Sequence, residues 1–126
     1  MITKFSLSVC LVLFMNLTSS SSDNLIISDL QEEKITIAEL VANPSNYEGK
    51  FVIISGECTK INANIMGLNW IHLIDGTKDD FDLVITTKES VRKGAKITIR
   101  AKVALNKDIG AGYVYDILLE EGTVFK

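Results

Sequence analysis

The sequence has few of the residues that build catalytic, metal or disulfide sites. It contains one histidine and two cysteines in 126 residues. Cys10 lies in an apolar leader, so Cys58 is the only thiol expected in a mature domain, which excludes an internal disulfide and a zinc site built from cysteine and histidine. A Gly-x-Ser-x-Gly motif and a phosphate-binding glycine loop before a helix are also missing. We therefore expect neither an enzyme nor a bound cofactor, and we assign no catalytic residue.

An excess of basic charge is missing as well. The chain has 13 Lys and Arg residues against 16 Asp and Glu residues, a net charge of -3. Proteins that neutralise many phosphates usually carry a basic excess or a basic stripe, so this balance counts against strong nonspecific nucleic-acid binding. The one local basic cluster is interpreted as the solvated face of a strand and its approach, and a ligand contact through Arg100 and Lys102 is the alternative. This cluster consists of Arg92, Lys93, Lys96, Arg100, Lys102 and Lys107.

The first 22 residues have the pattern of a secretory signal peptide. Lys4 supplies a positive charge, residues 5–17 are almost wholly apolar, and residues 18–22 are small and polar. The apolar run is shorter than the roughly 20 residues that a membrane-spanning helix needs. We therefore expect an exported bacterial protein, periplasmic or extracellular, with no membrane span after removal of the leader. Residues 23–34 are polar and weakly periodic and predict a flexible arm, which leaves residues 35–126 as the domain.

A short helix is predicted at the start of this domain. Thr36 and Glu39 have the spacing of a capping box, in which each side chain binds a backbone N–H that the first helical turn leaves free. Ile37 and Leu40 then form an apolar stripe at helical spacing. Pro44 ends the helix, because the residue before a proline is disfavoured in the α region.

Five strands follow, as indicated by alternating apolar and polar residues. The clearest alternation has Ile97, Ile99, Ala101 and Val103 on one face. Gly56 predicts a bend or bulge in the first strand. The strands are expected at residues 51–61, 69–75, 81–87, 96–103 and 113–119.

The segments between these strands carry turn residues. Residues 62–68, 88–95 and 106–112 are predicted to be loops or turns, residues 75–80 a hairpin turn, and residues 120–122 a break after the last strand. The strand at 81–87 is predicted to be half-buried, with Phe81, Leu83 and Ile85 on one face.

Five short strands and one helix predict an all-β domain. Closing such strands into a barrel removes exposed sheet edges, so we expect a five-stranded OB-type barrel, closed or partly open, with an N-terminal helix. A β-sandwich or an SH3-like barrel is the alternative. We expect a monomer.

Three segments support this prediction: YEGKFVIISGE at residues 47–57, NWIHLIDGT at 69–77 and VRKGAKITIRAKV at 91–103. They resemble OB-fold proteins of the tRNA-anticodon-binding-like, nucleic-acid-binding superfamily, and more narrowly small exported bacterial OB-fold proteins. The resemblance covers residues 36–124. It implies a binding function, with an oligonucleotide as the ligand.

The candidate binding face lies around the only tryptophan and the only histidine. Trp70 and His72 are two residues apart on a strand and so share a face, where an indole offers a stacking surface and an imidazole offers a donor and an acceptor. The resemblance implies that Trp70 stacks on bases. Core packing of Trp70 beside a surface His72 is the alternative. Tyr113 and Tyr115 alternate in the same way and either extend this face or pack in the barrel.

Two other ligand classes remain open. Met66, Trp70 and His72 also resemble the site of small periplasmic copper- and silver-binding OB-fold proteins, in which Met and His ligands hold a monovalent ion beside a tryptophan. This resemblance implies a soft-metal alternative, with Cu(I) or Ag(I) bound by Met66 and His72. An unknown protein partner is the other alternative, and the acidic balance of the chain favours it over bulk nucleic acid.

Overall fold

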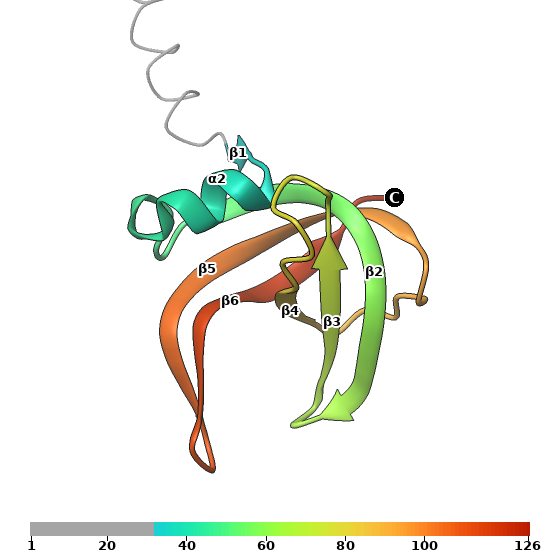
Figure 1. Ribbon diagram of the computed structural model, residues 1–126. Coiled ribbons are helices and arrows are strands. Elements are labelled where there is room, and N and C mark those ends of the chain that lie inside the picture. Colours follow the sequence, from blue (N-terminus) through green and yellow to red (C-terminus); the bar gives the residue numbers. More distant parts are fainter. Residues whose placement is uncertain (1–31) are drawn as a thin grey trace, which may run out of the picture. The chain divides into compact units, whose positions relative to one another are not determined.

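The computed structural model describes residues 32–126, which form a single β-sheet and two short helical segments (Figure 1). The predicted signal peptide and residues 23–31 of the predicted arm lie outside the described residues. The elements are β1 (Glu33–Lys34), α2 (Ile37–Ala42), the 3-10 helix η1 (Pro44–Asn46), β2 (Phe51–Ile65), β3 (Leu68–Ile74), β4 (Leu83–Thr87), β5 (Lys96–Gly110) and β6 (Tyr113–Val124).

Five of the strands close into a ring, in the order β2, β3, β4, β6, β5 and back to β2. The β4–β6 pair is parallel and the other pairs of the ring are antiparallel. The sixth strand, β1, lies parallel to β2 outside the ring. The predicted all-β barrel of five strands, preceded by one short helix, is confirmed, and the sandwich alternative is set aside.

The ring closes through a bend in β2. Residues 51–57 of this strand pair with β5, whereas residues from Glu57 onward pair with β3. Gly56 stands at the change of partner, where a Cβ atom would lie only 2.5 Å from the carbonyl oxygen of Ile74. The predicted bend at Gly56 is therefore present, and it depends on the missing side chain.

Two predicted loops are wrong. The strand β2 continues through Ile65 and β5 continues through Gly110, so each strand is followed by a tight turn rather than by a long loop. Asn64 and Asn106 adopt positive φ angles of 55° and 50° within these strands, a conformation that asparagine tolerates. The predicted break at residues 120–122 is also wrong, because β6 passes through Glu121 at a φ of 57°.

The prediction that the strand at residues 81–87 is half-buried is wrong as well. The strand β4 begins at Leu83, and all five of its residues are buried. Leu83 and Ile85 pack in the barrel interior, while Val84 packs in a second cluster on the other face. That second cluster covers the face that the alternation pattern assigned to water.

The helix α2 has the predicted cap. The Thr36 hydroxyl accepts the Glu39 N–H at 3.1 Å, and the Glu39 carboxylate accepts the Thr36 N–H at 2.8 Å. Ile37 and Leu40 are fully buried and join the interior core of the barrel. Figure 1 shows α2 at one end of the barrel, with the turns of the β2–β3 and β5–β6 hairpins at the other end.

The β3–β4 loop holds the start of this helix. An oxygen of Asp75 accepts the Ile37 N–H at 2.8 Å, and the Thr77 hydroxyl accepts the Ala38 N–H at 3.0 Å. The second oxygen of Asp75 accepts the hydroxyl and the N–H of Thr77. Burial alone raises the pKa of Asp75, but these hydrogen bonds outweigh it and lower the pKa below its ordinary value.

Candidate functional site

A groove of about 510 Å³ lies between the β2–β3 hairpin and the β5–β6 hairpin. This volume is within the range of small-ligand sites. Among residues 32–126, tyrosine and His72 are the only titratable side chains in its lining, and no Lys, Arg, Asp or Glu of this part of the chain lines it. The residues that line it are Asn62, Ile65, Met66, Trp70, His72, Ile109, Gly110, Ala111, Tyr113 and Tyr115.

Trp70 forms the floor of this groove. It lies on the outer face of β3, opposite Ile71, which points into the barrel. Its side chain is 6% exposed, its indole N–H donates to the Ile65 carbonyl at 2.9 Å, and its ring packs against Tyr115 with centroids 5.9 Å apart. The sequence predicted either that Trp70 lies on a binding face or that it packs in the core. Trp70 does both, because it is buried and still lines the groove.

His72 shares the outer face of β3 with Trp70. Its Nδ1 lies 2.5 Å from the Asp82 carboxylate, which follows the β3–β4 loop. His72 is mostly buried, with a side chain 15% exposed, whereas the Asp82 side chain is half exposed. This contact fixes the orientation of the imidazole ring at the edge of the groove.

The rim of the groove is exposed and apolar. Ile65 and Met66 are 45% and 63% exposed at the β2–β3 turn, and Tyr113 is 66% exposed where β6 begins. Tyr115 is half-buried between this rim and Trp70. The structure thus brings together the candidates Met66, Trp70, His72, Tyr113 and Tyr115.

The two basic candidates lie elsewhere. The Arg100 Nε contacts the Glu32 carboxylate at 2.5 Å, and its guanidinium lies 3.8 Å from the centre of the Phe51 ring. Lys102 pairs in register with Phe51 on β2 and with Glu120 on β6. Neither Arg100 nor Lys102 lines the groove.

Five lining residues were not among the candidates predicted from the sequence: Asn62, Ile65, Ile109, Gly110 and Ala111. Asn62, Ile65 and Ile109 fall in the segments predicted to be loops, whereas the structure places them in the extended ends of β2 and β5. Ile65 and Ile109 each precede a glycine by one or two residues, which is the pattern of an apolar strand end followed by a tight turn. That pattern is the signal that could have located them.

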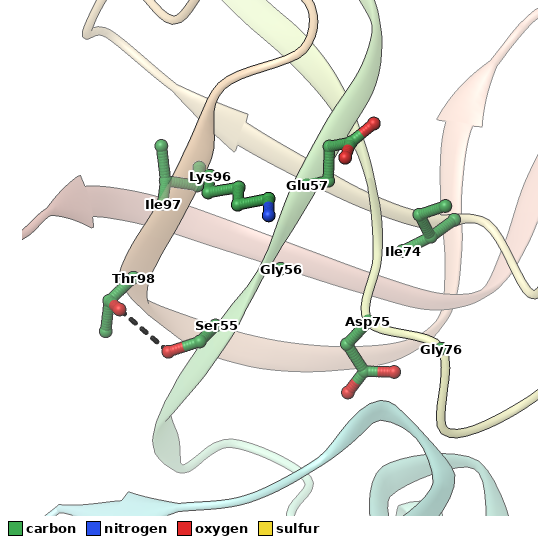
Figure 2. Close-up of a pocket in the computed structure, with 9 residues that line it drawn as sticks. All are labelled: Ser55, Gly56, Glu57, Ile74, Asp75, Gly76, Lys96, Ile97 and Thr98. Carbon is green, nitrogen blue, oxygen red and sulfur yellow. Dashed lines mark hydrogen bonds between the residues drawn. The ribbon is translucent and has the colours of Figure 1, made fainter.

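A second hollow, of similar volume, lies over the bend of β2 (Figure 2). Figure 2 shows the Lys96 side chain extending toward β2 near Gly56 and the Ser55 hydroxyl bonded to Thr98. Two acidic residues line the hollow, Glu57 and Asp75, and Asp75 already accepts the Ile37 N–H of α2.

The remaining reactive groups give no catalytic arrangement in the described part of the chain. Burial raises the pKa of the Cys58 thiol, whose sulfur donates to the Lys60 carbonyl. Within residues 32–126, no three side chains of His, Cys, Asp or Glu gather at one point as metal ligands. The two candidate ligands for a soft metal ion, Met66 and His72, both line the groove.

Fold and site together define a small β-barrel with an aromatic groove between two hairpins. No model of a known protein family matches the chain, and no curated protein matches it either. In residues 32–126, neither helical segment has the length and apolar character that crossing a membrane requires.

Proposed function

We propose that this protein is a non-enzymatic binding module whose groove takes an apolar side chain of a partner polypeptide. One observation carries the proposal: three of the five large hydrophobic side chains exposed in residues 32–126 line the groove, and they are Ile65, Met66 and Tyr113. Scattered exposed hydrophobic residues are normal, but a cluster beside a hollow is typical of an interaction site.

The charge of the groove favours a polypeptide over a nucleic acid. Phosphate binding draws its affinity from Lys and Arg, and no Lys or Arg of the described residues lines the groove. The Trp70 ring already packs against Tyr115, so stacking on a base is left mainly to Tyr113. An apolar side chain needs only the contact area that these residues supply.

A single-stranded oligonucleotide is the second candidate. The groove lies on the outer face of β3 between two hairpin turns, and OB-type barrels bind oligonucleotides on the corresponding strands and between the corresponding turns. Tyr113 and Tyr115 supply the aromatic surfaces. A soft metal ion is the third candidate, through Met66 and His72.

Trp70 emission reports on all three candidates, because Trp70 is the only tryptophan and forms the groove floor. We expect a saturable change with a peptide in which lysine alternates with valine around a central phenylalanine. The change should be much smaller with a thymidine oligonucleotide and with Cu(I). Replacing Met66 and Tyr113 together by serine should weaken peptide binding at least about tenfold, since hot-spot side chains contribute about 1 to 2 kcal/mol each.

The matched control is Phe125→Ser. Phe125 is another of the five exposed hydrophobic residues, is 52% exposed, and does not line the groove. Peptide affinity should be unchanged in this variant. Equal losses of peptide affinity in the groove variant and the control would overturn the proposal. A steeply salt-dependent change in emission with the oligonucleotide, and none with the peptide, would instead support the oligonucleotide as the ligand.

A further inference from the structure

Within residues 32–126, no strand pairs with one edge of β6 beside the groove. Residues 113–117 pair with β5 on one edge, from Gly110 opposite Tyr113 to Leu105 opposite Ile117. On the other edge, β4 pairs only with Leu119 and Gly122. No other backbone hydrogen bond from the described residues reaches residues 113–117. Backbone N–H and C=O groups point alternately to the two edges of a strand. About half of these groups in residues 113–117 are therefore free to form hydrogen bonds with an added strand.

This free edge borders the groove. Tyr113 and Tyr115 belong to the segment and line the groove together with Trp70 and His72 of β3. Figure 1 shows β6 on the side of its hairpin that faces β3, with β5 on the far side. An extended chain added to β6 would therefore place alternate side chains beside the exposed apolar rim.

The charge of β6 indicates what kind of chain fits. The strand carries Asp116, Glu120 and Glu121 and has no basic residue. Asp116 lies within the free segment and is exposed. A second copy of β6 would bring acidic residues against acidic residues, whereas a strand with lysine or arginine would be complementary.

We infer that the partner binds as an added β-strand along residues 113–117 of β6, and that it is an extended segment in which apolar and basic residues alternate. This inference rests on the proposed function and specifies its geometry. The backbone groups of the partner bond the free edge, one apolar side chain enters the groove, and basic side chains face Asp116.

Two N-methylated peptides test the strand pairing. In the lysine–valine–phenylalanine peptide, the N–H groups of alternate residues point to the same edge, so methylating one alternate set blocks pairing with β6 and methylating the other does not. We expect one methylated peptide to lose affinity at least about tenfold and the other to retain it. Amide exchange of residues 113–117, followed by NMR, should slow on binding of the unmethylated peptide.

The outcomes separate this inference from the proposed function. If both methylated peptides bind as tightly as the parent, or if the amides of residues 113–117 are not protected, strand addition is wrong while binding in the groove stands. If the parent peptide does not bind, the proposed function fails and strand addition fails with it. A peptide with glutamate in place of lysine should bind more weakly, and equal affinity would overturn the charge assignment.

Discussion

Replacing Gly56 by alanine is expected to destabilise the barrel by about 3 kcal/mol, because the new methyl group has no room. Its Cβ would lie 2.5 Å from the Ile74 carbonyl oxygen and 3.2 Å from the Ile74 carbonyl carbon. These are backbone atoms of a paired strand, so relief requires β2 and β3 to separate at the point where the ring closes. Chemical denaturation measures the loss, and circular dichroism shows whether the variant folds.

The neighbouring substitution Ser55→Ala is the control. Ser55 lies on the same strand, and its hydroxyl shares a 2.7 Å hydrogen bond with Thr98. Losing that bond should cost about 1 kcal/mol. If Gly56→Ala unfolds no more easily than Ser55→Ala, the close approach of β2 and β3 at Gly56 does not limit the fold.

The second large effect is expected for Asp75→Ala, with a loss of about 2 kcal/mol at neutral pH. The carboxylate of Asp75 accepts hydrogen bonds from the Ile37 N–H and from the N–H and hydroxyl of Thr77. Removing it leaves the first turn of α2 without one acceptor and releases the β3–β4 loop from the helix. Thermal unfolding at pH 7 measures the difference between the variant and the wild type.

This loss should depend on pH in a defined direction. The pKa of Asp75 is lower in the folded protein than its ordinary value of 3.8. The ionised carboxylate therefore stabilises the fold above pH 3.8, and this contribution disappears as the pH falls through the lowered pKa. The stability of wild type and Asp75→Ala should converge in that acidic range.

Asp75→Asn separates charge from hydrogen bonding. The amide retains one acceptor oxygen for the Ile37 N–H but cannot ionise. We expect an intermediate stability at neutral pH and a weaker dependence on acid than in the wild type. A gap between wild type and Asp75→Ala that stays constant down to pH 2 would contradict the role of the ionised carboxylate.

The parts of the fold that the sequence predicted are those controlled by local chemistry. Thr36 and Glu39 determine their own capping box, and Gly56 marks a bend that no other residue would permit. The errors occurred where tertiary packing overrides local preference. Asn64 and Asn106 are residues typical of loops, but they lie in strands. The strand β4 is buried on both faces, because the β5–β6 hairpin contributes Ile109 and Tyr115 to the cluster around Val84.

The candidate site was predictable to the same extent. The alternation of Trp70 with His72 places both on one strand face, and the structure finds both in the groove. Their meeting with Tyr113 and Tyr115 depends on how the β5–β6 hairpin folds against β3, which no local pattern encodes. The interaction of Arg100 with Glu32 and Phe51 is likewise a long-range contact, and it holds the Arg100 side chain away from the groove.

The pairing of β2 with β5 has a consequence for the order in which the chain folds. The β2–β3 and β5–β6 hairpins join neighbouring strands through tight turns, whereas the β2–β5 pairing has to bridge β3, β4 and two loops. Loop-closure entropy makes such a contact form late and slows folding. We expect φ-values near zero for Ile54, which lies in the closing segment, and higher values for Leu105 in the β5–β6 hairpin. The bend at Gly56 would then be the last part of the barrel to form and the first to open.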